Sequence, residues 1–454
     1  MEKIFKIRQR GSNILQELLS GFIVFLAMIY ILPVNSSILA AAGGGNEGAV
    51  FIATALTSGI CCFIMGLYAN LPIALSAGMG LNAYLAFTVC TSLGYSFNEG
   101  LFLVFVSGVL FLILSLTPLR EKLINAIPKS LKYAVSAGLG AFICFVGLKM
   151  SGIIKADNST LVTLGDFNNP PVLLALFGIL LTLVLMQIKG KIGKLAIVIS
   201  MFITAIIGLI LGLCNVSGMP KLVWSNTFSN YKVFFQNVGK CFSDDTVKVL
   251  LKPESYAVIF SLIFVNLFDT TATLIAVGDK VGVFDENNNM TGGKKAIIAD
   301  AIGAFICAPL GTSTVTSFAE STIGAESGAK TGLSACTTGL LFILATFLYP
   351  LFSIFAGVDG GYTPITSLAL VAVGCLMFSN LKNIDWNDTI IVISTFLIVI
   401  LMVLCYSVSD GLGLGMIAYC LMMIIAKRYK EVPLPIYIIT IFFIINYVVK
   451  VIIS

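Results

Sequence analysis

The chain has 454 residues, of which 58% are hydrophobic and 11% are charged, and it contains no histidine. A soluble domain carries about 25% charged residues, so a soluble fold of this composition would leave too much apolar surface in water. The absence of histidine excludes histidine zinc sites, Ser-His-Asp triads and histidine proton switches. The net charge is +5, and the basic residues cluster in short loops between apolar runs, which indicates a membrane protein rather than a nucleic-acid binder.

Apolar runs long enough to cross a bilayer, roughly 20 residues each, recur along nearly the whole chain. The first run follows a basic N-terminus and is too long for the apolar region of a signal peptide, so we expect this helix to be retained. Seven segments precede a polar stretch at 215–253 and seven follow it, and a last apolar run at 433–453 either spans the membrane or lies at its surface. The expected segments are 20–41, 49–69, 72–92, 100–117, 131–150, 171–188, 193–214, 254–278, 295–309, 311–326, 332–356, 363–380, 388–407 and 411–426.

The distribution of Lys and Arg predicts the orientation of the chain. With the N-terminus in the cytoplasm, most of the 27 basic residues fall in cytoplasmic loops, and most of the others lie in the stretch at 215–253. This is the positive-inside pattern, so we expect a multi-pass protein of the cell membrane with a cytoplasmic N-terminus. The 11 cysteines lie mostly inside apolar runs without metal-ligand spacing, and we therefore expect packing roles for them and neither a metal site nor a cofactor.

The third and tenth segments differ from ordinary spanning helices. Seven spans on each side of a central loop indicate two repeats of inverted topology, a common plan among secondary transporters. The third segment carries Pro72, Gly78 and Gly80, and the tenth carries Pro309 and Gly311 at corresponding places. Such interruptions point to a binding site near the middle of the membrane, because non-helical backbone at that depth must lie inside protein or beside a cavity. Two glycine-rich helix-packing faces are the alternative interpretation.

Few acidic residues fall inside apolar runs, and these few are candidates for a site. Asp269 lies in the eighth segment, Asp300 in the ninth and Glu320 in the tenth. A charge at this depth costs about 3 kcal/mol on insertion scales, so each carboxylate needs a partner, a cavity or a proton. We predict that Asp269 and Glu320 bind substrate and are the candidates for carrying a proton. For Asp300 the favoured role is a set of hydrogen bonds that ties neighbouring helices together.

Uncharged side chains near these acids extend the candidate site. Asn82 follows the glycine-rich interruption of the third segment and offers a donor and an acceptor to a planar polar ligand, with an interhelical hydrogen bond as its alternative role. Three aromatic residues nearby are able to stack on a ring, although packing is the commoner role in a chain with 33 Phe. They are Phe268, Phe318 and Tyr84.

The same stretches resemble a known family, the AzgA-like purine permeases of the nucleobase–ascorbate transporter superfamily. In the first half the resemblance is carried by FLAMIYILPVNSSIL (25–39), MGLYANLPIALSAGMGLNAYLAFTV (65–89) and LREKLINAIPKSLKYAVSAGLG (119–140). In the second half it is carried by FVNLFDTTATLIAVGDKVG (264–282), ADAIGAFICAPLGTSTVTSFAES (299–321) and GAKTGLSACTTGLLF (328–342). It is weaker in the central loop, the last three segments and the C-terminal run.

The resemblance implies an all-α polytopic fold with about 14 transmembrane segments in two inverted repeats of seven, and with short strands in segments 3 and 10 that meet near the midplane. It implies a core domain of segments 1–4 and 8–11, a gate domain of segments 5–7 and 12–14, a substrate between them that moves with the core in an elevator-like cycle, and a homodimer. The corresponding ranges are 1–118 and 254–360 for the core, 119–214 and 361–430 for the gate, 215–253 for an extracytoplasmic loop and 431–454 for a C-terminal apolar segment.

The resemblance also implies roles for individual residues. Asp269 and Glu320 match the family's carboxylates in segments 8 and 10, and Asn82 matches the asparagine of segment 3. Backbone groups near Gly80 and Thr314 would read the rest of the substrate. Ser321 stands where other branches often carry asparagine, which argues against the uracil and xanthine branches. Further supporting candidates are Asp300, Thr270, Thr273, Phe268 and Phe318.

Together these expectations give the hypothesis of proton-coupled uptake of purine bases, namely hypoxanthine, guanine or adenine. Carboxylates accept hydrogen bonds from ring N–H and exocyclic amino groups, and such bonds in a dry site discriminate strongly between ligands. The alternatives are a carrier of another nucleobase or of an inorganic anion on the same plan, a receptor-like membrane protein that does not transport, and a membrane enzyme. Two central acids fit an anion poorly, and without histidine no nucleophile–base pair is visible for an enzyme.

Overall fold

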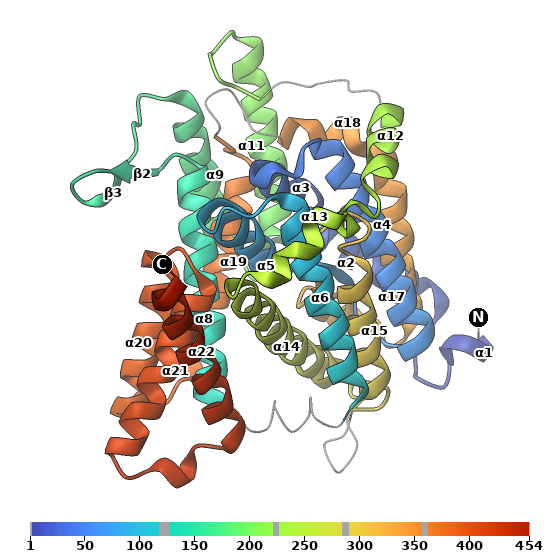
Figure 1. Cartoon of the computed structure of the whole chain (residues 1–454). Coiled ribbons are helices and arrows are strands. Elements are labelled where there is room, and N and C mark those ends of the chain that lie inside the picture. The colour runs from blue at the N-terminus through green and yellow to red at the C-terminus, as the bar shows by residue number, and fades with distance from the viewer. Residues whose placement is uncertain (1, 118–127, 221–226, 284–289, 356–361, 454) are drawn as a thin grey trace.

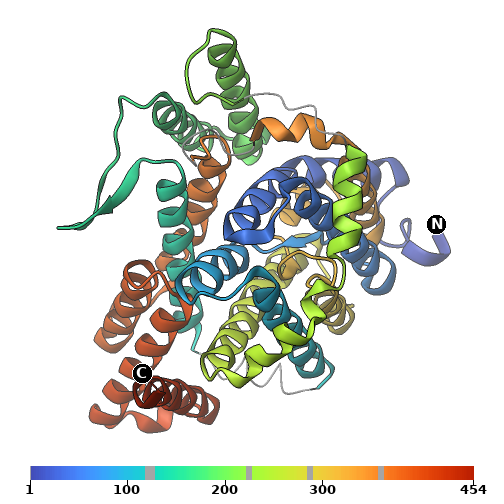
Figure 2. The ribbon, with the colours of Figure 1, turned by 45° about the horizontal axis from the view of Figure 1, so that its top comes forward.

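The structure, a computed structural model, describes residues 2–117, 128–220, 227–283, 290–355 and 362–453. Its helices form two groups that stand side by side (Figures 1 and 2), here called the first and the second bundle. The first bundle consists of α2 (Ile14–Met28), α3 (Ile31–Leu39), α4 (Glu47–Ile64), α5 (Met79–Ala83), α6 (Phe97–Leu116), α14 (Glu254–Val281), α15 (Gly293–Ile306), α16 (Ser321–Glu326) and α17 (Gly332–Ala345). The second consists of α8 (Lys129–Met150), α9 (Pro170–Leu185), α11 (Ala196–Leu213), α19 (Thr366–Phe378), α20 (Thr389–Leu404) and α21 (Val408–Ile425).

Many of these helices have the length and composition of membrane spans. Within the described ranges, seven helical stretches are long and apolar enough to cross a bilayer, or up to eight if the bent pair Asp245–Leu251 and Glu254–Thr271 counts as one span. The apolar helices α9 and α20 are shorter, with 16 residues each. The helical, many-spanning class predicted from the sequence is confirmed. The seven long stretches are Ile14–Gly44, Glu47–Ala69, Phe97–Leu116, Lys129–Met150, Ala196–Leu213, Gly332–Phe352 and Val408–Ile425.

The packing of the helices repeats itself when the two halves of the chain are exchanged. The second segment, α4, packs on the eleventh, α17, and the fourth, α6, packs on the ninth, α15, so each pair becomes the other when its members move by seven segments. The same exchange turns the packed pair of α8 and α20 into that of α19 and α9, and the pair of α9 and α11 into that of α20 and α21. This is the packing expected of two repeats with seven segments each.

The interruptions predicted in the third and tenth segments are confirmed as strands. β1 (Leu75–Ala77) and β4 (Val315–Ser317) pair with each other in an antiparallel sheet of two strands. Beyond the sheet, the amide of Gly78 donates to the carbonyl of Thr314 over 2.9 Å. Each strand leads into a short helix, β1 into α5 and β4 into α16. Because the two strands satisfy each other's peptide groups, non-helical backbone is tolerated at this depth.

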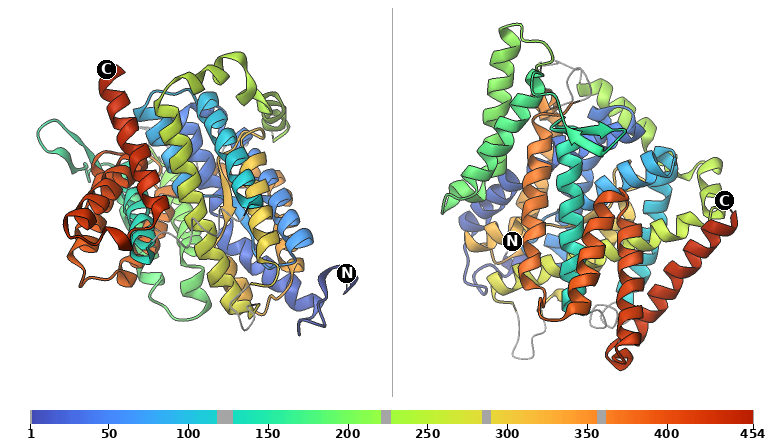
Figure 3. Two further views of the ribbon diagram at one scale, coloured as in Figure 1. Left: turned by 60° about the horizontal axis from the view of Figure 1, so that its bottom comes forward. Right: turned by 90° about the vertical axis from the view of Figure 1, so that its left-hand side faces the viewer.

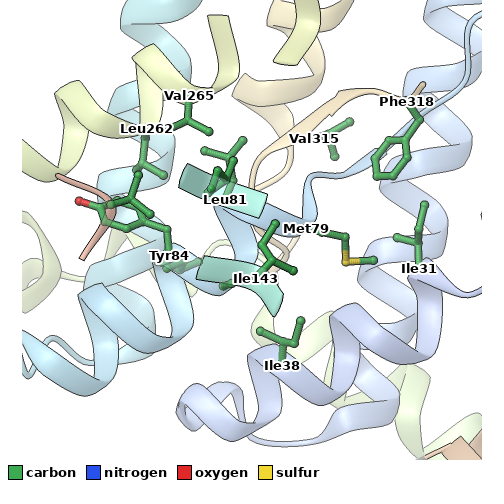
Figure 4. Packing of buried hydrophobic residues seen from close by; sticks show 14 of the residues in the cluster. Ile31, Ile38, Met79, Leu81, Tyr84, Ile143, Leu262, Val265, Val315 and Phe318 are labelled. Carbon is green, nitrogen blue, oxygen red and sulfur yellow. The ribbon is translucent and has the colours of Figure 1, made fainter. Parts of the chain in front are cut away.

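Apolar side chains from both bundles surround this sheet. In the view of Figure 4, Leu81 of α5 lies near Leu262 of α14, and Met79 lies between Ile31 and Ile143. Ile143 belongs to α8, so the two bundles meet where β1 ends. The strands therefore lie in a continuous apolar core, which fixes the positions of the short helices α5 and α16 that follow them.

Three features lie outside the two bundles. A hairpin of β2 (Ile154–Asp157) and β3 (Leu161–Leu164) protrudes from the second bundle and was not predicted. The central polar stretch contains α12 (Thr227–Asn237), which packs on α4, so part of this stretch covers the first bundle. The last apolar run forms α22 (Leu434–Ile453), which packs on α21 and ends far from the N-terminus (Figure 3).

The division into core and gate domains stays a prediction at this point. The two bundles contain the helices assigned to the two domains from the sequence. The expected boundaries after residues 118 and 360 fall outside the described residues. That the last apolar run, now α22, spans the membrane or lies at its surface also stays a prediction.

Candidate functional site

A cavity of about 640 Å³ lies between the two bundles, beside the β1–β4 sheet. The first bundle lines it with Gly80 at the start of α5, Asp269 in the middle of α14 and Glu320 just before α16. The second bundle lines it with Ser136 of α8 and Asn380 beyond α19. Cavities of 300–1,000 Å³, in round numbers, typically hold small organic ligands, so its size suits a ligand of that class.

The strand β4 and its continuation place Glu320 at the cavity. The amide of Phe318, just beyond β4, donates to the carbonyl of Ala74 over 3.0 Å, and the hydroxyl of Ser321 accepts from the amide of Ala74 over 2.9 Å. Glu320 lies between these two anchors, so its backbone is fixed on both sides. The hydroxyl of Tyr30 donates to Oε1 of Glu320 over 2.7 Å, which holds one of the two carboxylate oxygens.

The carboxylates of Asp269 and Asp300 have different surroundings. Asp269 lines the cavity, and its carboxylate accepts no hydrogen bond from any of the described residues. Asp300 does not line it: Oδ1 accepts from the amide and the hydroxyl of Ser317 over 2.9 and 2.8 Å, and Oδ2 accepts from the hydroxyl of Thr270 over 2.6 Å. Asp300 therefore ties α14, α15 and β4 together, which is the role favoured for it from the sequence.

The other predicted residues divide between the cavity and the protein behind it. Gly80, Thr273 and Phe318 line the cavity. Asn82 is fully buried away from it, with Oδ1 accepting from the hydroxyl of Ser313 and with Nδ2 lacking a partner in the described part of the chain. Thr314 is buried as well, so substrate contacts of Asn82 and Thr314 stay predictions. The side chain of Phe268 lies outside the described residues.

Sequence reasoning missed several residues that line the cavity. Tyr30, Ser136 and Asn380 all line it, and Asn380 donates from Nδ2 to Oγ of Ser136 over 2.8 Å. Hydroxyl and amide side chains are common in spanning helices, so their type alone carries little signal. What marks these residues as part of the site is a hydrogen-bond partner distant in the sequence, and a single sequence does not show which residues are partners.

Ion pairs lie at one edge of the cavity. Lys194, which lines the cavity from the short helix α10 (Lys191–Lys194), pairs with Glu326 at the end of α16. Glu326 also pairs with Lys280 of α14 over 3.0 Å. These pairs connect the turn before α11, in the second bundle, with the first bundle. Within the described ranges, no three His, Cys, Asp or Glu residues are grouped so that they could hold a metal ion.

Comparisons with known proteins agree with this architecture. The model of the Permease family matches residues 15–427. The guanine/hypoxanthine permease PbuG of Bacillus subtilis (strain 168) is 40% identical over 445 residues, which cover 95% of this chain and 96% of the relative. The adenine permease AdeP of Escherichia coli (strain K12) is 35% identical over 451 residues, which cover 99% of this chain and 96% of the relative.

A solved structure shares the fold at low sequence identity. The transmembrane domain of a cyanobacterium bicarbonate transporter, BicA, superposes with a TM-score of 0.59 at 14% identity, covering 88% of this chain and 97% of that chain. At this identity the likeness shows the fold alone. The family match and the full-length relatives go further: this chain belongs to the permease family of nucleobase–ascorbate transporters that its sequence resembles, and it is a multi-pass membrane protein.

Proposed function

We propose that this chain carries purine bases such as guanine, hypoxanthine or adenine across the cell membrane together with protons. Relatives that match it over nearly their whole length are guanine/hypoxanthine and adenine permeases. The observation that carries the proposal is the pair of carboxylates, Asp269 and Glu320, that line one cavity beside the β1–β4 sheet. The proposal names no enzyme activity, because the family is one of permeases.

The two carboxylates fit the chemistry of a purine base. A purine is flat and neutral and presents several N–H donors, and a carboxylate accepts such donors with charge-assisted hydrogen bonds. Asp269 accepts no hydrogen bond from the described residues, and Glu320 shares one oxygen with Tyr30, so both have capacity for a ligand. A charge buried in the membrane is costly, and a proton on either acid would reduce that cost while the loaded site moves.

We propose further that the first bundle is the core, the second the gate, and that they slide past each other in an elevator-like cycle. The contact at Gly80 supports sliding surfaces: a Cβ atom there would lie 2.4 Å from Cδ2 of Leu139 on α8, so glycine allows the two bundles to approach closely. A homodimer and a cytoplasmic N-terminus complete the proposal.

An inorganic anion is the less suitable substrate. The solved bicarbonate transporter shares the fold, but its low identity carries no information on this chain's ligand. An anion would meet Asp269 and Glu320 in the cavity, and two like charges in a low-dielectric site repel it. Lys194 also lines the cavity, but its charge is paired with Glu326.

Uptake of radiolabelled hypoxanthine by cells that lack purine transport tests the proposal. We expect accumulation that a protonophore abolishes and that unlabelled purines, but not uracil or sulfate, inhibit. Competition by uracil or sulfate, or no uptake at all, would refute purine transport. An Asp269→Asn variant that still concentrates hypoxanthine fully would remove Asp269 from the proton-carrying role.

A further inference from the structure

The wall that the second bundle contributes to the cavity carries a polar pair of its own. Ser136 lies in α8, and Asn380 lies in the short helix Ser379–Asn383 that follows α19. Nδ2 of Asn380 donates to Oγ of Ser136 over 2.8 Å, and both residues line the cavity. We call these two residues the Ser136–Asn380 pair.

A close helix crossing brings the pair together. The helices α8 and α19 approach so closely that a Cβ atom on Gly374 would lie 2.6 Å from the carbonyl oxygen of Gly140. Ser136 precedes Gly140 by one turn on the same face of α8, because residues four apart share a helix face. Asn380 lies six residues after Gly374, just beyond the end of α19, so the crossing sets Ser136 beside Asn380 at the cavity.

The hydroxyl of Ser136 differs from other helix hydroxyls in this chain. Thr54 and Ser394 each donate to the carbonyl four residues earlier in their own helix, over 2.7 Å. Within the described residues Ser136 has no such bond, and it accepts from Asn380. A hydroxyl that accepts one bond still has its own hydrogen to donate. The pair thus has an O–H donor next to an amide C=O acceptor.

The two carboxylates that the first bundle presents to the cavity do not offer a donor next to an acceptor. Ionised Asp269 and Glu320 accept hydrogen bonds and donate none. A purine also presents acceptors, and a buried acceptor without a donor is costly. At one edge, hypoxanthine and guanine carry an exocyclic oxygen next to a ring N–H, which is an acceptor beside a donor. The Ser136–Asn380 pair is the complement of that edge.

We propose that the Ser136–Asn380 pair determines specificity for 6-oxopurines. The hydroxyl of Ser136 donates to the exocyclic oxygen, and Oδ1 of Asn380 accepts from the adjacent ring N–H, while Nδ2 of Asn380 keeps the Ser136 hydroxyl oriented. The proposal rests on the proposed purine transport and adds the part of the base that the second bundle reads. Substrate then bridges the two bundles, held by carboxylates on one side and by the pair on the other.

The test compares two bases in three variants in whole-cell uptake. Hypoxanthine carries the exocyclic oxygen, and unsubstituted purine lacks it. For Ser136→Ala we expect the KM of hypoxanthine to rise about tenfold, as for loss of one specific hydrogen bond, with the inhibition constant of unsubstituted purine changed less than about twofold. Ser136→Thr keeps the hydroxyl and is expected to keep hypoxanthine affinity. Ser394→Ala is the matched control, because that hydroxyl is bonded within its own helix.

A further variant, Asn380→Asp, keeps the test decisive even if Ser136→Ala misfolds. In Asn380→Asp the carboxylate accepts the Ser136 hydroxyl hydrogen, which removes the donor from the cavity, and we expect the same selective loss of hypoxanthine. Equal weakening of both bases, or unchanged hypoxanthine affinity in Ser136→Ala, would overturn the assignment and leave purine transport intact. If the wild-type chain takes up no purine at all, the proposed function fails first, and the assignment fails with it.

Discussion

At the scale of single residues, Asp269 and Asp300 are two aspartates in neighbouring apolar segments whose hydrogen-bond partners differ. Asp300 accepts hydrogen bonds from Ser317 and Thr270, whereas Asp269 accepts none from the described residues. Both lie in apolar segments and look alike in the sequence. The first is built into the fold, and the second is left with its hydrogen-bonding capacity facing a cavity.

We therefore expect opposite effects from the same substitution at the two positions. Asp300→Asn sets an amide NH₂ against donors, and losing hydrogen bonds to a charged group should destabilise the protein by about 2 kcal/mol or more. Asp269→Asn should leave stability nearly unchanged and reduce hypoxanthine uptake at least tenfold. Thermal unfolding in detergent and uptake, measured on both variants, check this. A destabilised Asp269→Asn together with a stable Asp300→Asn would reverse the assignment.

The residues of the cavity were predictable from the sequence only in part. Asp269 and Glu320 could be found because a charge in an apolar run has a known cost and so needs a reason. Tyr30 and Ser136 could not, because burying a hydroxyl in a membrane protein costs little free energy, and the role of each depends on a partner distant in the sequence, Glu320 or Asn380. Asn82 was selected for its place after a glycine-rich interruption, and the structure sets it behind the cavity, bonded to Ser313.

At the scale of elements, interruptions of the membrane helices were easier to predict from the sequence than short strands and helices. Proline and glycine disfavour a helix at 72–80 and 309–311; of the two paired strands, β1 lies within the first stretch and β4 follows the second. The hairpin of β2 and β3 and the helix α12 lie in stretches without strong apolar periodicity. For such short elements, contacts with the rest of the fold outweigh local propensity, so the sequence carries no clear signal for them.

The ion pairs of Glu326 link the bundles at the edge of the cavity, and we expect Glu326→Gln to loosen that link. Exposed ion pairs contribute about 0–1 kcal/mol, so overall stability should stay nearly the same. Access to the cavity should increase, and a Met377→Cys reporter, in a chain whose exposed Cys214, Cys375 and Cys405 are replaced by serine, should react with a maleimide a few times faster in the Glu326→Gln background. Asp245→Asn is the control, because it breaks an exposed pair with Lys248 away from the cavity. Equal reaction rates would show that the pairs do not cover the cavity.

The turn before α20 makes stability depend on acid pH. Asp388 accepts from the amide of Ile390 over 3.0 Å and from Nη1 of Arg428 over 2.8 Å. Partial burial raises the pKa of the Asp388 carboxyl, but the hydrogen bonds and the charge of Arg428 outweigh burial and hold the pKa below its usual value. A carboxyl with a lowered pKa in the folded protein stabilises the fold above its unfolded pKa, and this contribution is lost as the pH falls through the folded pKa.

We expect the melting temperature in detergent to fall with acidification below about pH 4, the ordinary pKa of an aspartate. Arg428→Ala should lower the melting temperature at pH 7 and make the fall between pH 5 and pH 3 shallower. Lys430→Ala, at a neighbouring residue that forms no ion pair among the described residues, serves as the control. The same acid slope in wild type and Arg428→Ala would mean that other carboxyls dominate.

At the scale of the whole molecule, helices from the two halves of the chain pack on each other, and both halves line the same cavity, so both are necessary for the site.

The orientation of the chain in the membrane can be tested with two native cysteines. In the proposed topology, α11 and α20 both end on the outer side, and each is followed by an exposed cysteine, Cys214 and Cys405. A membrane-impermeant maleimide should therefore label intact cells, and Cys214→Ser combined with Cys405→Ser should abolish this labelling. Labelling of these two positions only after permeabilisation would place the N-terminus outside.

The pairing of β1 with β4 also constrains how the protein is made. Leu75 pairs with Ser317, so one strand is synthesised long before its partner exists. Until then β1 holds unpaired peptide groups within the bilayer, where no water can satisfy them. The first half is therefore costly to expose to lipid until the second half has been made. A fragment that ends before β4 keeps the same unpaired edge.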